Sequence, residues 1–256
     1  SLKLLLVSYS SNGKSENQIL VSQTIIEKYP ELSLGYESLA LGYLNINDFV
    51  SALQILLVGF NKFPNEIKFP ITIADIYHKS KDYNNAEKYY LYTLNIDPKM
   101  FSVHNHLAMM YEDMEYVSQA DSLFKYIINN NKNDAIHLND YAYVISERRN
   151  VSKAELLYAL NLAEEAISIE PENASFLDTV GWIYYKMGTY NMAQEYLEKS
   201  LKINKHNPVI LEHMGDIYQK LNDSNHALVV YEQALIMDAE NIILQKKMKK
   251  INEKSK

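Results

Sequence analysis

The sequence predicts an all-α protein built as an α-solenoid, and three observations point to this class. A period of 34 residues runs through most of the chain, apolar residues within each period follow helical spacing, and turns such as residues 186–190 separate the helical stretches. A period of this length is typical of proteins whose modules bury their apolar faces by stacking on their neighbours. We therefore expect a series of helical hairpins.

The module boundaries follow from the spacing of prolines. Pro30, Pro64 and Pro98 lie 34 residues apart, and each closes one module. The predicted modules are 1–32 (incomplete), 33–66, 67–100, 101–134, 135–173 (with a five-residue insertion), 174–207 and 208–241, with a capping helix at 242–256. Since no linker interrupts them, we expect about seven repeats in one solenoid domain, 1–256.

Equivalent positions, here called slots and counted from the first residue of a module, carry equivalent residues. Slot eleven is usually tyrosine, and slot twenty is usually alanine. Slot eight is small in every complete module: Ala40, Ala74, Ala108, Ala142, Gly181 and Gly215. Small residues let the paired helices approach closely, so a larger side chain at slot eight should cost about 1 to 3 kcal/mol through overpacking.

Two positions depart from the regular frame. Pro70 is tolerated only in the first turn of a helix, so the first helix of module 67–100 should start near Phe69. The insertion in the fifth module falls around residues 146–154 and contains Arg148 and Arg149, the only arginines of the chain. An insertion at a turn predicts either a specific surface on the rim of the solenoid or simply extra helical length with exposed guanidinium groups.

The segment LDTVGWIYYKMGTYNMA, residues 177–193, shows the pattern most fully. Its characteristic slots are held by Leu177, Val180, Gly181, Tyr184, Gly188, Tyr190 and Ala193, followed by Leu197 and Ser200. This pattern resembles the tetratricopeptide repeat. The resemblance implies a right-handed superhelix whose first helices line a concave groove for an extended or helical segment of another protein. The sequence from Asn139 onward is similar to that of bacterial proteins of this family, many of which are exported or tethered in the cell envelope. The resemblance therefore favours the cell envelope over the cytoplasm as the location of this protein.

The resemblance places partner contacts on slots five, nine and twelve of each first helix, here called the first-helix stripe. The candidate partner-binding residues are Glu37, Leu41, Asp75, Met109, Tyr143, Asp178, Trp182, Tyr185, Glu212 and Asp216. Acidic and apolar side chains on one surface favour a partner that is basic and apolar. Trp182, the only tryptophan, is interpreted either as an anchor for the partner or as packing in the seam between helices.

Charge and composition narrow the function classes. The net charge is −7, but residues 246–256 hold six lysines and one glutamate, so the rest of the chain is near −12. An acidic surface repels phosphates, which disfavours nucleic-acid binding. The lysine-rich end is expected to seal the last repeat, with a basic docking tail as the alternative. No apolar run is long enough to cross a bilayer, so no membrane span is predicted.

No motif indicates catalysis, a cofactor or a metal site. The sequence lacks cysteine, a glycine-rich phosphate loop and HExxH, and no module supplies the basic clamp with which some tetratricopeptide proteins hold a carboxylate. His106 and Asp140 share a slot in adjacent first helices and could share a hydrogen bond, but a metal needs more ligands. The sequence therefore predicts a non-enzymatic scaffold for protein–protein interaction.

Two alternatives to a free-standing scaffold remain open. The chain begins at Ser1 without methionine, so we expect a processed product or a piece of a longer protein, and it could be an accessory region of a protein whose catalytic or anchoring part lies elsewhere. It could also be a self-associating module, and its oligomeric state is not predicted.

Overall fold

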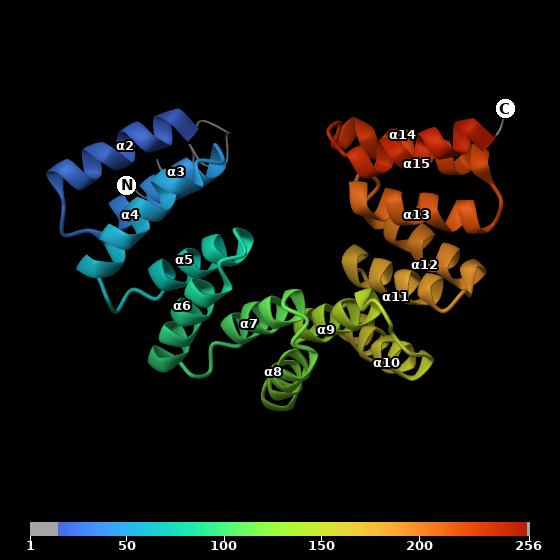
Figure 1. Ribbon diagram of the computed structural model, residues 1–256, viewed down its shortest axis with the longest axis horizontal. Helices are drawn as coiled ribbons and strands as arrows, with labels where there is room; N and C mark the ends of the chain where they lie inside the picture. Colours follow the sequence, from blue (N-terminus) through green and yellow to red (C-terminus); the bar gives the residue numbers. More distant parts are fainter. Residues whose placement is uncertain (1–14, 255–256) are drawn as a thin grey trace. The chain divides into compact units, whose positions relative to one another are not determined.

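The computed structural model describes residues 15–254, and all regular secondary structure among them is helical (Figure 1). The helices are α2 (Ser15–Lys28), α3 (Ser33–Asn45), α4 (Phe49–Lys62), α5 (Lys68–Lys79), α6 (Tyr83–Ile96), α7 (Phe101–Asp113), α8 (Val117–Asn130), α9 (Ala135–Glu147), α10 (Lys153–Ile169), α11 (Ala174–Lys186), α12 (Tyr190–Ile203), α13 (Pro208–Lys220), α14 (Ser224–Met237) and α15 (Ile242–Lys254). The all-α solenoid prediction is confirmed. Residues 1–14, the first part of the predicted incomplete module 1–32, lie outside the described residues.

Each complete module forms one hairpin, and its turn demands an unusual backbone. Five of the six hairpins have turns of three residues, as the helix bounds show. The middle residue of each of these turns has a positive φ: Asn47 (60°), Lys81 (62°), Glu115 (59°), Gly188 (80°) and Asn222 (62°). This left-handed conformation suits glycine or asparagine, so lysine and glutamate occupy it at a cost.

The five extra residues of the fifth module are shared between its turn and its second helix. Residues 148–152 replace the usual three-residue turn, and α10 has 17 residues where the other second helices have 14. Ser152 and Glu155 cap α10 reciprocally. The Arg148 side chain lies 3.8 Å from Glu155 and is only 9% exposed, whereas Arg149 is exposed, so the exposed guanidinium groups predicted with extra helical length are found at Arg149 and not at Arg148.

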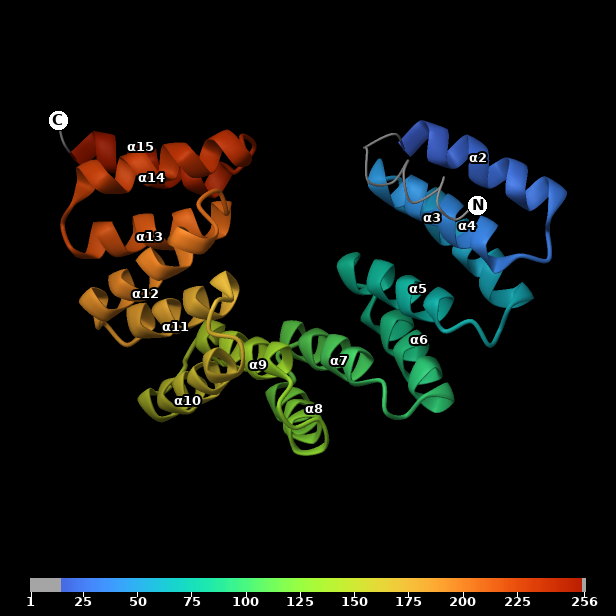
Figure 2. The ribbon, with the colours of Figure 1, turned by 180° about the vertical axis from the view of Figure 1, so that it is seen from behind.

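The chain divides into two compact units, residues 1–127 and 128–256. Within each unit, successive hairpins stack through their first helices and through contacts between a second helix and the next first helix (Figures 1 and 2). In unit 1 the core includes Phe69, Ile73 and Tyr90, and in unit 2 it includes Leu197 and Ile210. The prediction of one domain spanning the whole chain stays a prediction.

Close helix packing explains the small residues at slot eight. A Cβ added to Gly181 would overlap Leu197, and one added to Gly215 would overlap the ring of Tyr231. The equivalent Ala74 and Ala108 are fully buried. The second helix therefore sits so close to the first that slot eight has no room for a larger side chain.

Helix α5 and the C-terminal helix α15 begin at or next to the residues expected from the sequence. Helix α5 begins at Lys68, one residue before the expected start, and Pro70 falls in its first turn. Helix α15 covers the predicted cap, apart from residues 255–256, which lie outside the described residues. Its Leu244 and Ile251 are buried against α13 and α14 in a cluster with Tyr231, so α15 caps the last repeat.

Candidate functional site

The first-helix stripe of unit 1 exposes two apolar side chains. Leu41 on α3 is 44% exposed, and Met109 on α7 is 39% exposed. Glu37, also on α3, lies 3.1 Å from the Lys68 ammonium group and accepts a hydrogen bond from Ser33. The unit thus presents apolar surface beside a carboxylate that already has partners.

Asp75 on α5 is held by two side chains from other helices. The hydroxyl group of Tyr90 donates a 2.7 Å hydrogen bond to its Oδ1, and His106 Nδ1 on α7 lies 3.0 Å from the same atom. Burial and the neighbouring Asp75 raise the pKa of the fully buried Tyr90 above its ordinary value. A second pair, His78 with Asp113 at 2.8 Å, also joins α5 to α7. These pairs connect adjacent modules of unit 1.

In unit 2, Trp182 lies in the seam between first helices. It is 9% exposed, and its ring stacks on Tyr185 and on His213 with centroid distances of 4.7 and 4.0 Å. Its indole N–H donates a 2.6 Å hydrogen bond to Glu147 at the end of α9. Trp182 on α11 therefore contacts α9 and α13, the packing that the seam interpretation describes, and its use as a partner anchor stays a prediction.

The carboxylates of this unit are also paired internally. His213 Nδ1 lies 2.9 and 3.1 Å from the two oxygens of the buried Asp178. The Lys247 ammonium group of α15 lies 2.7 Å from both Glu212 and Asp216 on α13. Burial alone would lower the pKa of Lys247, but hydrogen bonds to the two carboxylates outweigh it and hold that pKa above its ordinary value.

Tyr143 on α9 is the most open aromatic residue of the unit 2 stripe. Its side chain is 36% exposed. Burial raises its pKa first, and the charges of Glu147, Asp178 and Glu212 raise it further. The Tyr143 hydroxyl group thus lies near three carboxylates.

The internal pairs follow the repeat frame. Tyr90 and Tyr231 occupy slot twenty-four, and each donates to the aspartate at slot nine of its own module, at 2.7 Å to Asp75 and 2.6 Å to Asp216. The second partner comes from slot six of the next first helix, as in His106, His213 and Lys247. Each of the five predicted stripe carboxylates, Glu37, Asp75, Asp178, Glu212 and Asp216, has an internal partner.

Sequence reasoning missed these slot-six partners, although one signal was present. In three of the four modules with an acid at slot five or nine, the next first helix carries histidine or lysine at slot six, whereas Thr72 follows Glu37. The structure pairs His106 with Asp75, whereas the hydrogen bond expected between His106 and Asp140 would join the two units and stays a prediction.

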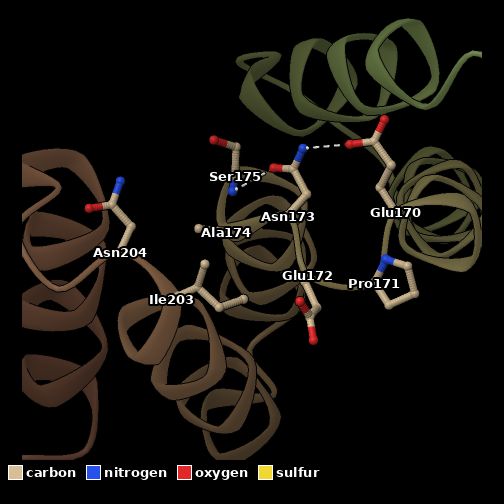
Figure 3. A pocket seen from close by; sticks show the side chains of 8 residues that line it. All are labelled: Glu170, Pro171, Glu172, Asn173, Ala174, Ser175, Ile203 and Asn204. Atoms are coloured by element: carbon tan, nitrogen blue, oxygen red, sulfur yellow. Dashed lines mark hydrogen bonds between the residues drawn. The ribbon is translucent and has the colours of Figure 1, made fainter.

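An open depression of about 900 Å³ lies away from the stripe, between the α10–α11 loop and the end of α12 (Figure 3). Asn173 donates a 2.9 Å hydrogen bond to Glu170 and accepts one of 3.1 Å from the Ser175 backbone, which caps α11. The polar groups of Asn173 are therefore already used at the start of α11.

Within residues 15–254, no three His, Asp or Glu residues are grouped to hold a metal, and no helix is long and apolar enough to span a bilayer.

The family model for the tetratricopeptide repeat matches residues 71–100, 174–207 and 210–241, three of the hairpins described above. The chain is a tetratricopeptide repeat protein. Repeats of this family are generally non-catalytic scaffolds that bind other proteins. The chain matches none of the curated proteins with which it was compared.

Solved structures with the same architecture share little sequence with this tetratricopeptide repeat protein. A tetratricopeptide repeat protein from Parabacteroides merdae is 15% identical with a TM-score of 0.79, covering 98% of this chain and 97% of that one. The Cut9–Hcn1 structure of the APC/C is 16% identical with a TM-score of 0.73, covering 96% of this chain, which spans 48% of that one. TTC0263 of Thermus thermophilus is 18% identical with a TM-score of 0.63, covering 72% and 98%. Such likeness shows the fold alone.

Proposed function

We propose that this protein is a non-enzymatic scaffold that binds a peptide segment or a helix of a partner protein along its first-helix stripe. The observation that carries the proposal is the exposure of apolar side chains at slot nine, where Leu41, Met109 and Tyr143 are 44%, 39% and 36% exposed. Such side chains on helices that are packed against their neighbours can bury area on binding with little loss of conformational entropy.

The charges near these side chains favour a partner that also carries lysine or arginine. The Asp75 side chain is 44% exposed and the Asp113 side chain is 61% exposed, although each already pairs with a histidine. The carboxylates of Glu147, Asp178 and Glu212 lie near the Tyr143 hydroxyl group and raise its pKa. A cation of the partner would be attracted to both places, in unit 2 also by the ring of Tyr143.

Internal pairing lowers the binding energy that the stripe carboxylates can supply to a partner. Because each predicted stripe carboxylate has an internal partner, an incoming cation replaces a contact and gains little net energy. We infer that the apolar side chains supply most of the affinity and that the carboxylates mainly select the charge of the ligand. Trp182, at 9% exposure, would act chiefly by holding α9, α11 and α13 in place.

Selection from a random peptide library against the full chain tests this proposal. We expect enriched peptides to combine aliphatic residues with lysine or arginine, and their binding to weaken at least about tenfold in Leu41→Glu and Met109→Glu. Val58→Glu is the matched control, because Val58 is 52% exposed on the second helix α4. Equal binding by the wild type, both stripe variants and the control would contradict a binding role for the stripe.

A further inference from the structure

Asn139 on α9 holds a buried amide oxygen that has no hydrogen-bond donor. The residue is 9% exposed, and its Oδ1 atom is buried and accepts no hydrogen bond from residues 15–254. Burying such an atom without a donor costs folding free energy, and native structures keep few of these atoms without a reason in function or hydration. Asn139 is at slot five of the first-helix stripe, where a bound ligand can supply the missing donor.

Asn139 begins a row of three polar side chains on one face of α9. Tyr143 and Glu147 follow at intervals of four residues, so all three, here called the α9 row, lie on the same side of the helix. The hydroxyl group of Tyr143 makes no hydrogen bond with the described residues. The two internal partners of Glu147, the Trp182 indole at 2.6 Å and the Lys186 ammonium group at 3.1 Å, both approach its Oε1 atom. The Glu147 side chain is 43% exposed, and its Oε2 atom accepts no hydrogen bond within residues 15–254.

The charges around the α9 row favour a cation. The carboxylates of Glu147, Asp178 and Glu212 lie near the hydroxyl group of its tyrosine. The ammonium groups of Lys186 and Lys247 pair with two of these carboxylates, and an imidazole pairs with the third. While that imidazole is neutral, one carboxylate charge stays unbalanced, so a cation that binds the row gains Coulomb energy.

The groups available on the α9 row suit a guanidinium group better than an ammonium group. An amide oxygen, a phenol oxygen and a carboxylate oxygen are all acceptors, and they are spread along two turns of the helix. A guanidinium group offers five N–H donors in one plane, has no acceptor, and stacks on aromatic rings. An ammonium group is a compact point charge, so it contacts fewer of these acceptors at once.

We propose that the α9 row binds an arginine side chain of the partner, with the guanidinium group stacked on Tyr143 and hydrogen-bonded to Glu147 Oε2 and to Asn139. Because Asn139 Oδ1 is buried in the free protein, the amide rotates about χ2 to accept its hydrogen bond. The assignment rests on the proposed function, since the arginine belongs to the segment bound along the stripe. It adds Glu147, at slot thirteen, and a preference for arginine over lysine.

Acetyl-arginine methylamide and its lysine and citrulline analogues, each titrated into the full chain and followed by NMR, test the site directly. We expect saturable shifts centred on α9 with the arginine compound, and a dissociation constant at least about threefold higher with the lysine compound. Citrulline has nearly the same shape as arginine without the charge, and its analogue should not bind. Equal binding of the arginine compound and either analogue would overturn the proposal.

Substitutions in the α9 row identify the groups that hold the guanidinium group. Tyr143→Leu and Glu147→Gln should each weaken binding of acetyl-arginine methylamide at least about threefold. The matched controls are Tyr92→Leu, at a tyrosine that is 37% exposed on α6, and Glu165→Gln, at an exposed glutamate on α10. Unchanged binding in both variants of the row would overturn the proposal.

Asn139→Leu separates ligand binding from a structural role. It should weaken arginine binding and yet keep the thermal unfolding midpoint at or above that of the wild type, because it removes a buried oxygen that lacks a donor. A lower midpoint with unchanged arginine binding would show that Asn139 serves only the fold. Leu41→Glu and Met109→Glu in unit 1 should leave binding of acetyl-arginine methylamide unchanged, so this proposal and the peptide-binding proposal can fail separately.

Discussion

Asp75 in unit 1 and Asp216 in unit 2 occupy the same slot but have different second partners. Each accepts a hydrogen bond from a buried tyrosine of its own module. The next first helix then supplies His106 to Asp75 and Lys247 to Asp216. The repeat geometry thus fixes where the partner stands, while the residue at slot six decides whether it is an imidazole or an ammonium group.

Burial separates the two sites further. The Asp75 side chain is 44% exposed, whereas the Asp216 side chain is 15% exposed. Water therefore screens the pair in unit 1 much more than the pair in unit 2. The same arrangement should contribute little to stability in one unit and more in the other.

Alkaline pH should give the largest effect and should act more strongly on unit 2. Burial raises the pKa of Tyr111 in unit 1 and of Tyr185 in unit 2 to about 12. It also raises the pKa values of two further tyrosines in unit 1, Tyr89 and Tyr90, and of four in unit 2, Tyr143, Tyr184, Tyr218 and Tyr231. A raised folded-state pKa means that stability is complete below pH 10, the ordinary value for tyrosine, and is lost as the pH rises through the folded-state value.

Circular dichroism with tyrosine absorbance between pH 9 and 12.5 would follow this loss, and hydrogen exchange would assign it to a unit. We expect helicity to fall as the tyrosines ionise, with exchange in unit 2 accelerating first. Tyrosines that ionise near pH 10 with no loss of helicity would contradict the argument.

Among the substitutions, removing the slot-six partner should give the largest difference between the two units in lost unfolding free energy. Lys247→Met leaves Glu212 and Asp216 without their ammonium group at 23% and 15% side-chain exposure, and should cost about 2 kcal/mol of unfolding free energy. His106→Leu removes a pair whose members are 39% and 44% exposed, and should cost less than about 1 kcal/mol. Urea unfolding measures both, with the exposed Lys246→Met as the control. Equal losses of unfolding free energy in Lys247→Met and His106→Leu would contradict the idea that burial makes the pair in unit 2 more stabilising.

Removing the hydroxyl groups of Tyr90 and Tyr231 tests the tyrosine–aspartate hydrogen bond that is present in both units. Tyr231→Phe and Tyr90→Phe each delete one hydrogen bond to a carboxylate and should cost about 1 to 2 kcal/mol, somewhat more in unit 2 because Asp216 is less exposed. Hydrogen exchange of the surrounding helices would assign each loss to its own unit. A neutral Tyr231→Phe would show that this hydrogen bond does not stabilise the site.

Substitutions in the turns should give the smallest changes in stability, and these changes should have opposite signs in the two units. Lys81→Gly in unit 1 relieves a side chain held at a φ of 62° and should stabilise by about 0.5 to 1 kcal/mol. Gly188→Ala in unit 2 should destabilise by a similar amount, because its φ is 80° although nothing within 4 Å would obstruct the new Cβ. Thermal unfolding measures both. Destabilisation by Lys81→Gly would show that the turn conformation is not what costs energy there.

The sequence by itself determined the hairpins. Small residues recur at slot eight because paired helices meet there, and helical spacing marks the buried faces, so the helix bounds could be placed to within a few residues, as at Lys68. These features depend on residues close together in one module. The five-residue insertion was visible as a break in the period, but its division between a turn and α10 was not.

Only the tertiary structure decided how the stripe is used internally. The contacts of His106 with Asp75, of His213 with Asp178 and of Lys247 with Asp216 depend on how far one first helix is offset from the next. The burial of Trp182 against His213 depends on the same offset. A repeat period fixes which residues are equivalent, but the side chains that meet across a seam are set by the stacking of modules, because that stacking brings together residues about 30 positions apart.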